Sequence, residues 1–156
     1  MSKSTLNTIK IINGRTGYKN SKLGIDVAIA QSLKGKRVVF VFNNYLSQSF
    51  TRFNNLLKKA GISNYQTKNI DIRFDKLLLM KREEVDRWIK NNVQHKADLI
   101  IIDTLNTSTG RYKKTKHLES SLDNLNYLSS TLDCSVIGLY TGVIPWLLKT
   151  NIGLLK

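Results

Sequence analysis

A short segment near the start of the chain carries residue types that could bind phosphate. Residues 14–21 read GRTGYKNS. Phosphate-binding loops have the pattern Gly, any four residues, Gly, Lys and then Ser or Thr, because backbone N–H groups and the lysine surround the phosphates. Gly14 and Ser21 match the two ends of this pattern. Lys19 stands in place of the second glycine, and the uncharged Asn20 in place of the lysine, so the segment predicts a phosphate loop that lacks its cation.

The neighbouring segments predict the elements that would position this loop. The isoleucine-rich run 9–12 predicts a buried strand, and Gly14 and Gly17 make the turn after it flexible. From Ser21 a helical pattern extends to about Gly35. The apolar residues that we expect on its buried face are Leu23, Val27, Ile29, Ala30 and Leu33. A loop between a strand and a helix N-terminus favours anions, while an ordinary turn with a few polar residues is the alternative.

A carboxylate follows the clearest strand in the sequence. Residues 98–103 read DLIIID, so this apolar strand ends in Asp103. If the strand is a neighbour of the first one, Asp103 lies beside the phosphate loop, where a metal and a phosphate would meet. The alternative is that Asp103 only caps the following segment through its side chain.

The densest basic cluster lies in residues 107–117, TSTGRYKKTKH. Its Gly and Thr content predicts an exposed loop, and a basic loop with one aromatic residue suits a nucleic-acid backbone with one stacked base. The residues that we expect to contact nucleic acid are Arg111, Tyr112, Lys113, Lys114 and Lys116. A solvated loop without a partner is the alternative. His117 has no Cys or His nearby in the sequence, so we expect no metal site here.

Charge and composition also favour a polyanionic partner. The 156 residues include 25 Lys and Arg against 11 Asp and Glu, which gives a net charge of +14. Neutralising phosphates with such cations releases counterions and gives affinity for nucleic acid. The alternative is a lysine- and asparagine-rich coding bias that scatters charge over the surface.

The length predicts one domain, residues 1–156, with a substantial core. We find neither a long apolar segment for a membrane span nor a charged-then-apolar leader, and we therefore expect a cytoplasmic protein. Cys134 is the single cysteine, which predicts no internal disulfide and no cysteine-rich zinc site. Its apolar surroundings predict a buried thiol.

The remaining segments alternate in type. The apolar run 38–42 predicts a buried strand, residues 50–59 a helix with Phe53 in the core, and residues 65–72 a weaker strand. Further helices are expected at 77–93 and 118–132, a last strand at 134–140, and an apolar tail around Pro145 and Trp146 that folds back on the core or meets a partner. The order predicts an α/β fold, with a mostly parallel five-stranded sheet and helices on both faces.

With this order of elements, the chain from about Thr8 to Gly142 resembles the RecA-like ATPase core of DnaB-like replicative hexameric helicases, a three-layer P-loop NTPase-like fold. GRTGYKNS stands where that family has its phosphate loop, and KGKRVVFVFNNYLSQSFTRF looks like its second strand and helix, including Arg52. ADLIIIDTLN looks like its metal-binding strand, which implies that Asp103 is at the magnesium-coordinating position. LNYLSSTLDCSVIGLYTG looks like the helix and strand that lead to its phosphate-sensing position, Thr141. The resemblance implies a nucleotide-site remnant made of Gly14, Gly17, Lys19, Asn20, Ser21, Asp103 and Thr141.

The departures from the family all remove catalytic groups. The loop lacks its lysine, the sensing glutamine is replaced by Thr141, and the glutamate that polarises the attacking water falls on Asn43 or Asn44. An amide is no base, so we expect a degenerate Walker A site without ATP hydrolysis and without catalytic residues. No cofactor is expected, and ATP with Mg²⁺ would bind only if the altered loop still holds it.

The expected function is that of a catalytically inactive, DNA-binding accessory factor in DNA replication or recombination, from a phage or mobile element, and so located in the host cell cytoplasm. One alternative is a protein-interaction module that docks on and regulates a helicase or recombinase. Another is an active P-loop ATPase in which Lys19 replaces the missing lysine. Self-assembly into a homo-oligomer is compatible with each of these.

Overall fold

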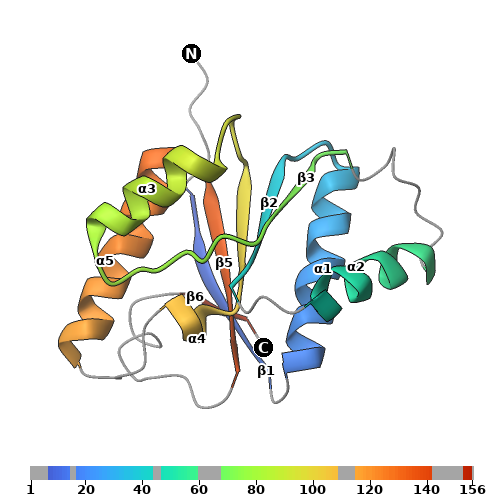
Figure 1. Ribbon diagram of the computed structural model, residues 1–156, viewed down its shortest axis with the longest axis horizontal. Coiled ribbons are helices and arrows are strands. Elements are labelled where there is room, and N and C mark those ends of the chain that lie inside the picture. The colour runs from blue at the N-terminus through green and yellow to red at the C-terminus, as the bar shows by residue number, and fades with distance from the viewer. Residues whose placement is uncertain are drawn as a thin grey trace.

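A computed structural model describes residues 7–14, 17–43, 47–59, 68–108, 115–141 and 153–155 of the chain. The strands form one parallel sheet in the order β3-β2-β4-β5-β1-β6 (Figure 1). They are β1 (Ile9–Gly14), β2 (Val38–Phe42), β3 (Ile70–Arg73), β4 (Leu99–Asp103), β5 (Ser135–Thr141) and β6 (Gly153–Leu155). The helices are α1 (Gly17–Leu33), α2 (Ser47–Lys59), α3 (Arg82–Asn92), α4 (Leu105–Ser108) and α5 (Thr115–Leu132). The predicted α/β fold with a parallel sheet is confirmed.

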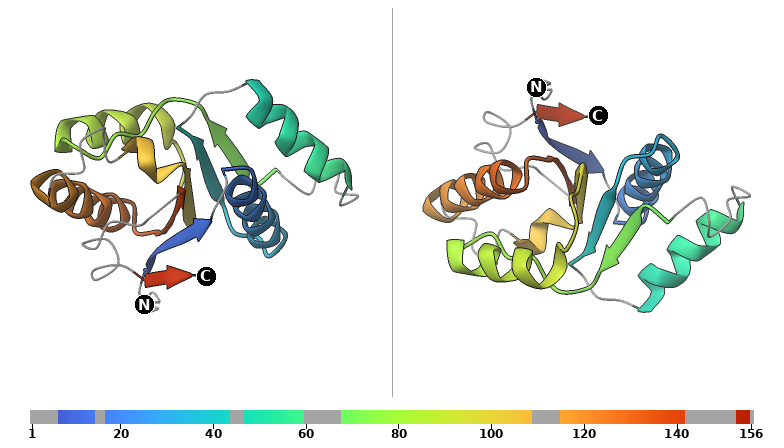
Figure 2. Two further views of the ribbon diagram at one scale, coloured as in Figure 1. Left: turned by 90° about the horizontal axis from the view of Figure 1, so that it is seen from below. Right: turned by 90° about the horizontal axis from the view of Figure 1, so that it is seen from above.

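The sheet lies between two layers of helices. Helices α1 and α2 cover one face, and α3 and α5 cover the other, in every view (Figures 1 and 2). Each face has its own apolar core, one containing Trp88 and Leu128 and the other containing Phe40 and Phe53. The three-layer arrangement expected from the alternation of elements is therefore confirmed, as is the position of Phe53 in the core.

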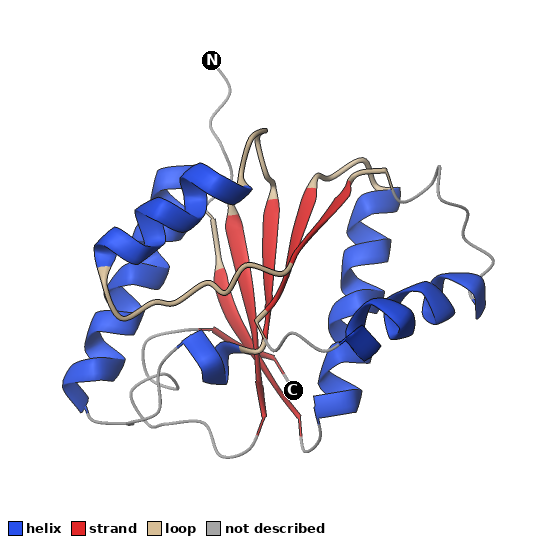
Figure 3. Ribbon diagram, viewed as in Figure 1, coloured by secondary structure: helices blue, strands red, loops and turns tan. Residues whose placement is uncertain are grey.

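The central strands are buried as their continuous apolar sequences predict. Every residue of β2 is buried, and so is every residue of β4 except the partly exposed Asp103 at its end. The sheet, red in Figure 3, has helices on both sides. The sheet has a sixth strand, β6, which pairs in parallel with β1 and was not among the five predicted strands. Part of the apolar tail thus folds back on the sheet, while Pro145 and Trp146 lie outside the described residues.

Helix α1 presents a different face to the core from the one predicted. It begins at Gly17, earlier than expected, and it ends before Gly35, whose φ of 86° is typical of a helix C-terminus. Leu23 and Leu33 are 41% and 53% exposed, so their assignment to the buried face is wrong. Ala30 is likewise exposed, Val27 is half-buried and Ile29 is buried. The buried face consists instead of Ser21, Gly24, Ile25, Ala28, Ile29 and Ser32.

Small residues explain this orientation of α1. A Cβ atom built at Gly24 would lie 2.7 Å from Leu139 Cδ1 and 3.4 Å from Phe40 Cζ. The helix axis can therefore approach the sheet at this point only because Gly24 has no side chain. A large residue at position 24 would hold the helix away from the sheet here, whereas Leu23 lies on the side of the helix that faces outward.

The segment before α3 is the second departure. A helix was predicted from Leu77, but α3 begins at Arg82 and residues 77–79 have no regular secondary structure. Leu77 and Leu79 are both fully buried with the half-buried Leu78 between them, an alternation typical of extended chain. Side-chain amides bond the main chain here: Leu77 N–H donates to Asn43 Oδ1 over 2.8 Å, and Leu79 O accepts from Asn124 Nδ2 over 2.7 Å. These bonds replace those of a helix.

Candidate functional site

The carboxyl ends of the parallel strands bring the predicted site residues to one edge of the sheet. Gly14 at the end of β1 is the register partner of Thr141 at the end of β5, and Asp103 at the end of β4 is the register partner of Leu139. Helix α1 begins at Gly17, three residues after β1 ends (Figure 1). Parallel α/β sheets bind ligands at this edge.

A hydrogen bond links the loop-helix unit to the strand that ends in the carboxylate. The Ser21 hydroxyl donates to Asp103 Oδ2 over 2.7 Å, and the Ser21 residue is 8% exposed. The condition that the two strands be neighbours is not met, because β5 lies between β1 and β4. Helix α1 crosses above β5 closely enough at Gly24, one turn after Ser21, for the hydroxyl to reach Asp103 nonetheless.

The Ser21–Asp103 pair has the donor chemistry of a magnesium site. Hydroxyl and carboxylate oxygens are hard ligands of the kind that Mg²⁺ binds together with phosphate oxygens. Gly17, Lys19 and Asn20 belong to the first turn of α1, but the side chains of Lys19 and Asn20 lie outside the described part of the structure. Within the described ranges no group of three or more His, Cys, Asp or Glu side chains could hold a metal ion. The pair therefore fits a cation only if a bound phosphate completes the coordination.

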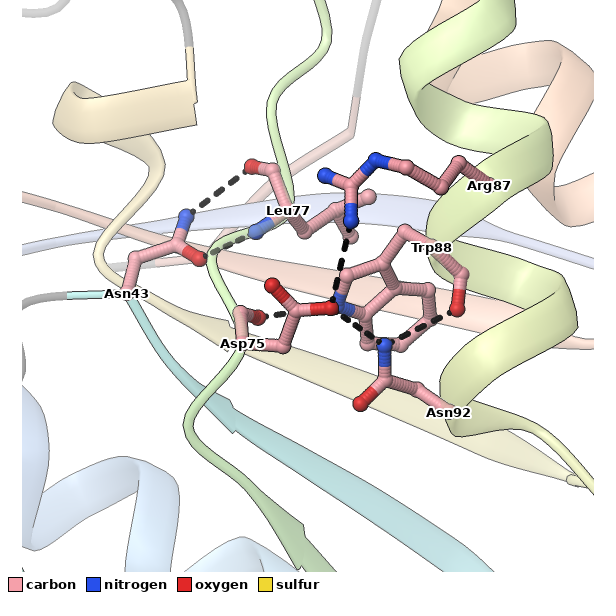
Figure 4. Close-up of polar contacts among 6 residues, drawn as sticks. All are labelled: Asn43, Asp75, Leu77, Arg87, Trp88 and Asn92. Carbon is pink, nitrogen blue, oxygen red and sulfur yellow. Dashed lines mark hydrogen bonds and ion pairs between the residues drawn. The ribbon is translucent and has the colours of Figure 1, made fainter.

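Asn43, one of two candidates for the position of the catalytic glutamate, is turned toward the main chain. The residue is fully buried, and its Nδ2 donates to the Leu77 carbonyl over 3.2 Å (Figure 4). Nδ2 also donates to the Thr104 carbonyl over 3.2 Å. Its Oδ1 accepts from the Leu77 N–H over 2.8 Å, and its own N–H donates to the Asp103 carbonyl over 2.7 Å. The side-chain amide of Asn43 thus connects the end of β2 to the segment before α3, at Leu77, and to the turn after β4, at Thr104. Asn44, the other candidate, lies outside the described residues.

A second hydrogen-bonded cluster fixes the turn that follows Asp103. The Asp103–Thr104 peptide bond is cis. The Thr104 hydroxyl lies 2.8 Å from the Leu139 carbonyl oxygen, and the Asn106 amide exchanges two bonds with the main chain of Thr141. The Thr141 N–H donates to Asn106 Oδ1 over 3.0 Å, and Asn106 Nδ2 donates to the Thr141 carbonyl over 2.9 Å. The predicted phosphate-sensing position is thus held at the carboxyl edge through its backbone.

Further polar contacts hold the segment between β3 and α3. Asp75 accepts from Asn92 Nδ2 over 2.9 Å and lies 3.6 Å from Arg87, and its carbonyl accepts from Trp88 Nε1 over 2.9 Å (Figure 4). Because this segment also bonds to Asn43, helix α3 is connected to the carboxyl edge. The asparagine contacts join residues far apart in the sequence, and no local pattern indicates them.

The predicted nucleic-acid segment is described only at its ends. Thr107 and Ser108 belong to α4, and α5 begins at Thr115, so the expected loop from 107 to 117 is shorter than predicted. Residues 111–114, with Arg111, Tyr112, Lys113 and Lys114, lie outside the described residues; Lys116 belongs to the first turn of α5, without a described side chain. Both flanking helix ends lie on the side of the molecule where the parallel strands end (Figure 1).

Two other expectations concern Cys134 and membranes. Cys134 is fully buried, and burial raises the pKa of its thiol to about 12, so the expected buried thiol is confirmed and it is a poor nucleophile at neutral pH. None of the helices in the described residues is long and apolar enough to cross a membrane.

Comparisons with known proteins support the fold. No protein-family model matches the chain, and no curated protein sequence matches it. Among solved structures, the crystal structure of the RadB recombinase is similar to it, with a TM-score of 0.58 and 15% sequence identity over 86% of this chain. The match covers 61% of the RadB chain, so the present chain spans less than two thirds of that protein. At this identity the likeness shows the fold, which is RecA-like.

Proposed function

We propose, from a RecA-like fold as the premise, that this chain is a DnaB-helicase-like domain that does not hydrolyse ATP and binds nucleic acid as an accessory factor in DNA replication or recombination. Its origin in a phage or mobile element, its single-domain organisation over residues 1–156 and its cytoplasmic location belong to the same proposal. The groups that would contact nucleic acid are those of the basic segment around Tyr112.

The orientation of Asn43 carries the first half of the proposal. A general base must accept a proton from water and point toward the γ-phosphate. The Asn43 amide has no basic atom and is fully buried among main-chain groups. A substitution to Glu would bury a carboxylate against the Leu77 and Thr104 carbonyls, so the position is adapted to packing. The uncharged Asn20 removes the cation that neutralises phosphate charge in the transition state.

Steady-state release of inorganic phosphate from Mg-ATP tests this half. We expect no turnover above the buffer blank, and the same result for Asp103→Ala and Ser21→Ala with circular dichroism as the check on folding. Turnover that Asp103→Ala abolishes would contradict the proposal and support an active ATPase in which Lys19 supplies the cation. A loss of turnover in Lys19→Ala, but not in Lys22→Ala, would then show that Lys19 supplies the cation. Lys22 is the control because it is exposed and lies three residues further along the same helix.

Charge and position support the second half. The net charge is +14. Five of the residues that contribute cations or a stacking surface lie in residues 111–116. This segment follows α4, which begins two residues after Asp103 at the end of β4. A single strand that follows the edge would place phosphates against lysines and one base against an aromatic ring.

Fluorescence anisotropy with labelled single-stranded DNA, duplex DNA and RNA over a salt series tests this half. Each phosphate contact contributes about 0.7 to 0.9 to the slope of log K against log salt, so Lys113→Ala with Lys114→Ala should lower the slope by about 1.4 to 1.8. The matched control removes two charges from the exposed end of α2, Lys58→Ala with Lys59→Ala, and should leave the slope unchanged. Binding without salt dependence, or equal effects of both pairs, would contradict the assignment.

A protein-interaction module that docks on a helicase or recombinase is a second candidate, favoured by the surface of α1. Leu23 and Leu33 are 41% and 53% exposed, and Val27 and Ala30 lie at helical spacing between them. Size-exclusion chromatography with a purified replicative helicase or recombinase at high salt tests it. A complex that Leu23→Ser with Leu33→Ser abolishes, and Lys34→Ser does not, would support docking through α1; elution as a dimer would indicate self-association.

A further inference from the structure

A cavity of about 570 Å³ lies at the amino-terminal edge of the sheet, opposite the Ser21–Asp103 pair. It lies between the second half of α1 and the first residues of β1, β4 and β5. Val27, Leu99 and Ile137 give it an apolar surface, and Lys10, Lys36 and Lys96 supply cations. Its volume falls in the range of about 300 to 1,000 Å³ that is typical of small-molecule sites.

Lys10 is unusual for its position in the sheet. It interrupts an isoleucine strand on the face that α1 covers, where the next residue on the same face, Ile12, is 2% exposed and belongs to the core. Its register partners are Ile137 on β5 and Gly153 on β6, so one neighbour is apolar and the other has no side chain. Lys10 and its register partner Ile137 both line the cavity, so a cationic and an apolar residue lie side by side in its wall.

The acidic residues of the cavity are already paired. Asp98 Oδ2 accepts from the backbone N–H of Arg37 over 2.9 Å. Asp133 Oδ1 accepts from Asn7 Nδ2 over 2.7 Å, and Lys96 Nζ donates to the Asp133 carbonyl over 2.7 Å and lies 3.9 Å from Oδ2.

Two lysines remain for a ligand. In the part of the chain that the structure describes, the ammonium groups of Lys10 and Lys36 form no hydrogen bond or ion pair. Among the described residues that line the cavity, three lysines against two aspartates give a net positive charge.

We propose that this cavity binds an organic anion with an apolar body, of the class of a nucleoside monophosphate. Lys10 and Lys36 would hold the phosphate as point charges, the body would lie against Val27, Leu99 and Ile137, and the Gln31 amide would supply a donor and an acceptor to it. The site is separate from the carboxyl edge and does not depend on the function proposed above. The same chemistry is available from a free nucleotide and from the terminal nucleotide of a 5′-phosphorylated strand.

Isothermal titration calorimetry with AMP, adenosine and inorganic phosphate tests the ligand class. AMP is expected to bind, and adenosine or phosphate alone to bind at least tenfold more weakly. Lys10→Ala and Lys36→Ala should each weaken AMP binding at least tenfold. Lys34→Ala is the matched control, since Lys34 is exposed in the same turn and does not line the cavity. Gln31→Glu adds a carboxylate at a half-buried helix position, so it should abolish binding in a folded protein.

Variants at the other edge separate this site from the proposed function. Ser21→Ala and Lys113→Ala with Lys114→Ala should leave the affinity for AMP unchanged. The proposal fails if AMP does not bind, if Lys34→Ala acts like Lys36→Ala, or if Ser21→Ala abolishes binding while Lys10→Ala does not. Competition of AMP with a strand in its 5′-phosphorylated and unphosphorylated forms distinguishes the two sources. Displacement of AMP by the phosphorylated form alone indicates that the site binds the terminal nucleotide of a strand. If neither form displaces AMP, the site binds a free nucleotide.

Discussion

Substituting Gly24 with Ala tests how the Ser21–Asp103 pair is assembled. A methyl group at Gly24 would lie 2.7 Å from Leu139 Cδ1 and 3.4 Å from Phe40 Cζ. Leu139 is fully buried, so it cannot simply turn its side chain into solvent. Either α1 moves away from the sheet or the core around Leu139 repacks, and Ser21, one turn earlier, shifts with the helix.

Two opposing contributions set the size of the effect. Adding a methyl group to a tightly packed core costs about 1 to 3 kcal/mol. Ala is better than Gly inside a helix by about 1 kcal/mol. We therefore expect Gly24→Ala to lower the free energy of unfolding by about 1 kcal/mol, which corresponds to a fall in Tm of about 2 to 4 °C for a chain of this size.

Urea denaturation followed by circular dichroism measures this change. Ala30→Gly, at an exposed position of the same helix, reports helix propensity alone and should cost about 1 kcal/mol. In a Leu139→Val background the methyl group has more room, so the double variant should be more stable than the sum of the single effects by about 1 kcal/mol. One contrary result is that Gly24→Ala stabilises the protein by the difference in helix propensity between Ala and Gly. Another is that the effects of Gly24→Ala and Leu139→Val on the free energy of unfolding simply add. Either result would mean that the close approach of α1 does not position Ser21.

Further predictions concern buried polar groups. Asn43→Ala removes three hydrogen bonds and leaves buried main-chain groups without these partners, so it should lower the free energy of unfolding by at least about 2 kcal/mol. The control is Asn91→Ala at an exposed position, which should change the free energy of unfolding by less than about 0.5 kcal/mol in the same urea titration. Trp88→Phe removes the bond from Nε1 to the Asp75 carbonyl and should lower stability by about 1 to 2 kcal/mol; an unchanged urea midpoint would contradict it. The Cys134 thiol ionises at about pH 9.0 in the unfolded chain but has a pKa of about 12 when folded, so its stabilising contribution is complete below pH 9 and is lost as the pH rises toward 12. Between pH 8 and pH 10 the wild type should therefore lose about 1 kcal/mol more than Cys134→Ala, and parallel pH profiles would refute this.

The central strands were predictable from their composition. The runs of β2 and β4 are continuously apolar, and only a strand covered on both faces has that composition. The face of α1 was not predictable from hydrophobicity alone, since the closest approach to the sheet is at Gly24 while Leu23 is exposed. Close packing, rather than apolar area, decides that orientation.

The candidate site was predictable in part. The phosphate-loop pattern and the carboxylate after an apolar strand identified Ser21 and Asp103, and the structure brings them within hydrogen-bonding distance. How they meet was not predictable. Strand β5 lies between β4, which ends in Asp103, and β1, which precedes the helix of Ser21, and only long-range strand pairing decides this order. Leu77 was assigned to a helix because its neighbours have helical periodicity, whereas the bonds from Asn43 come from 34 residues away.

The asparagine contacts around the segment before α3 have a consequence for local opening of the fold. The Leu77 N–H belongs to no helix or strand, yet it is buried and bonded to Asn43 Oδ1. Its amide proton should exchange with solvent deuterium as slowly as those of β2 and β4, because releasing it requires the end of β2 and the segment before α3 to separate together. An irregular stretch of chain would then belong to the last cooperative unit to open.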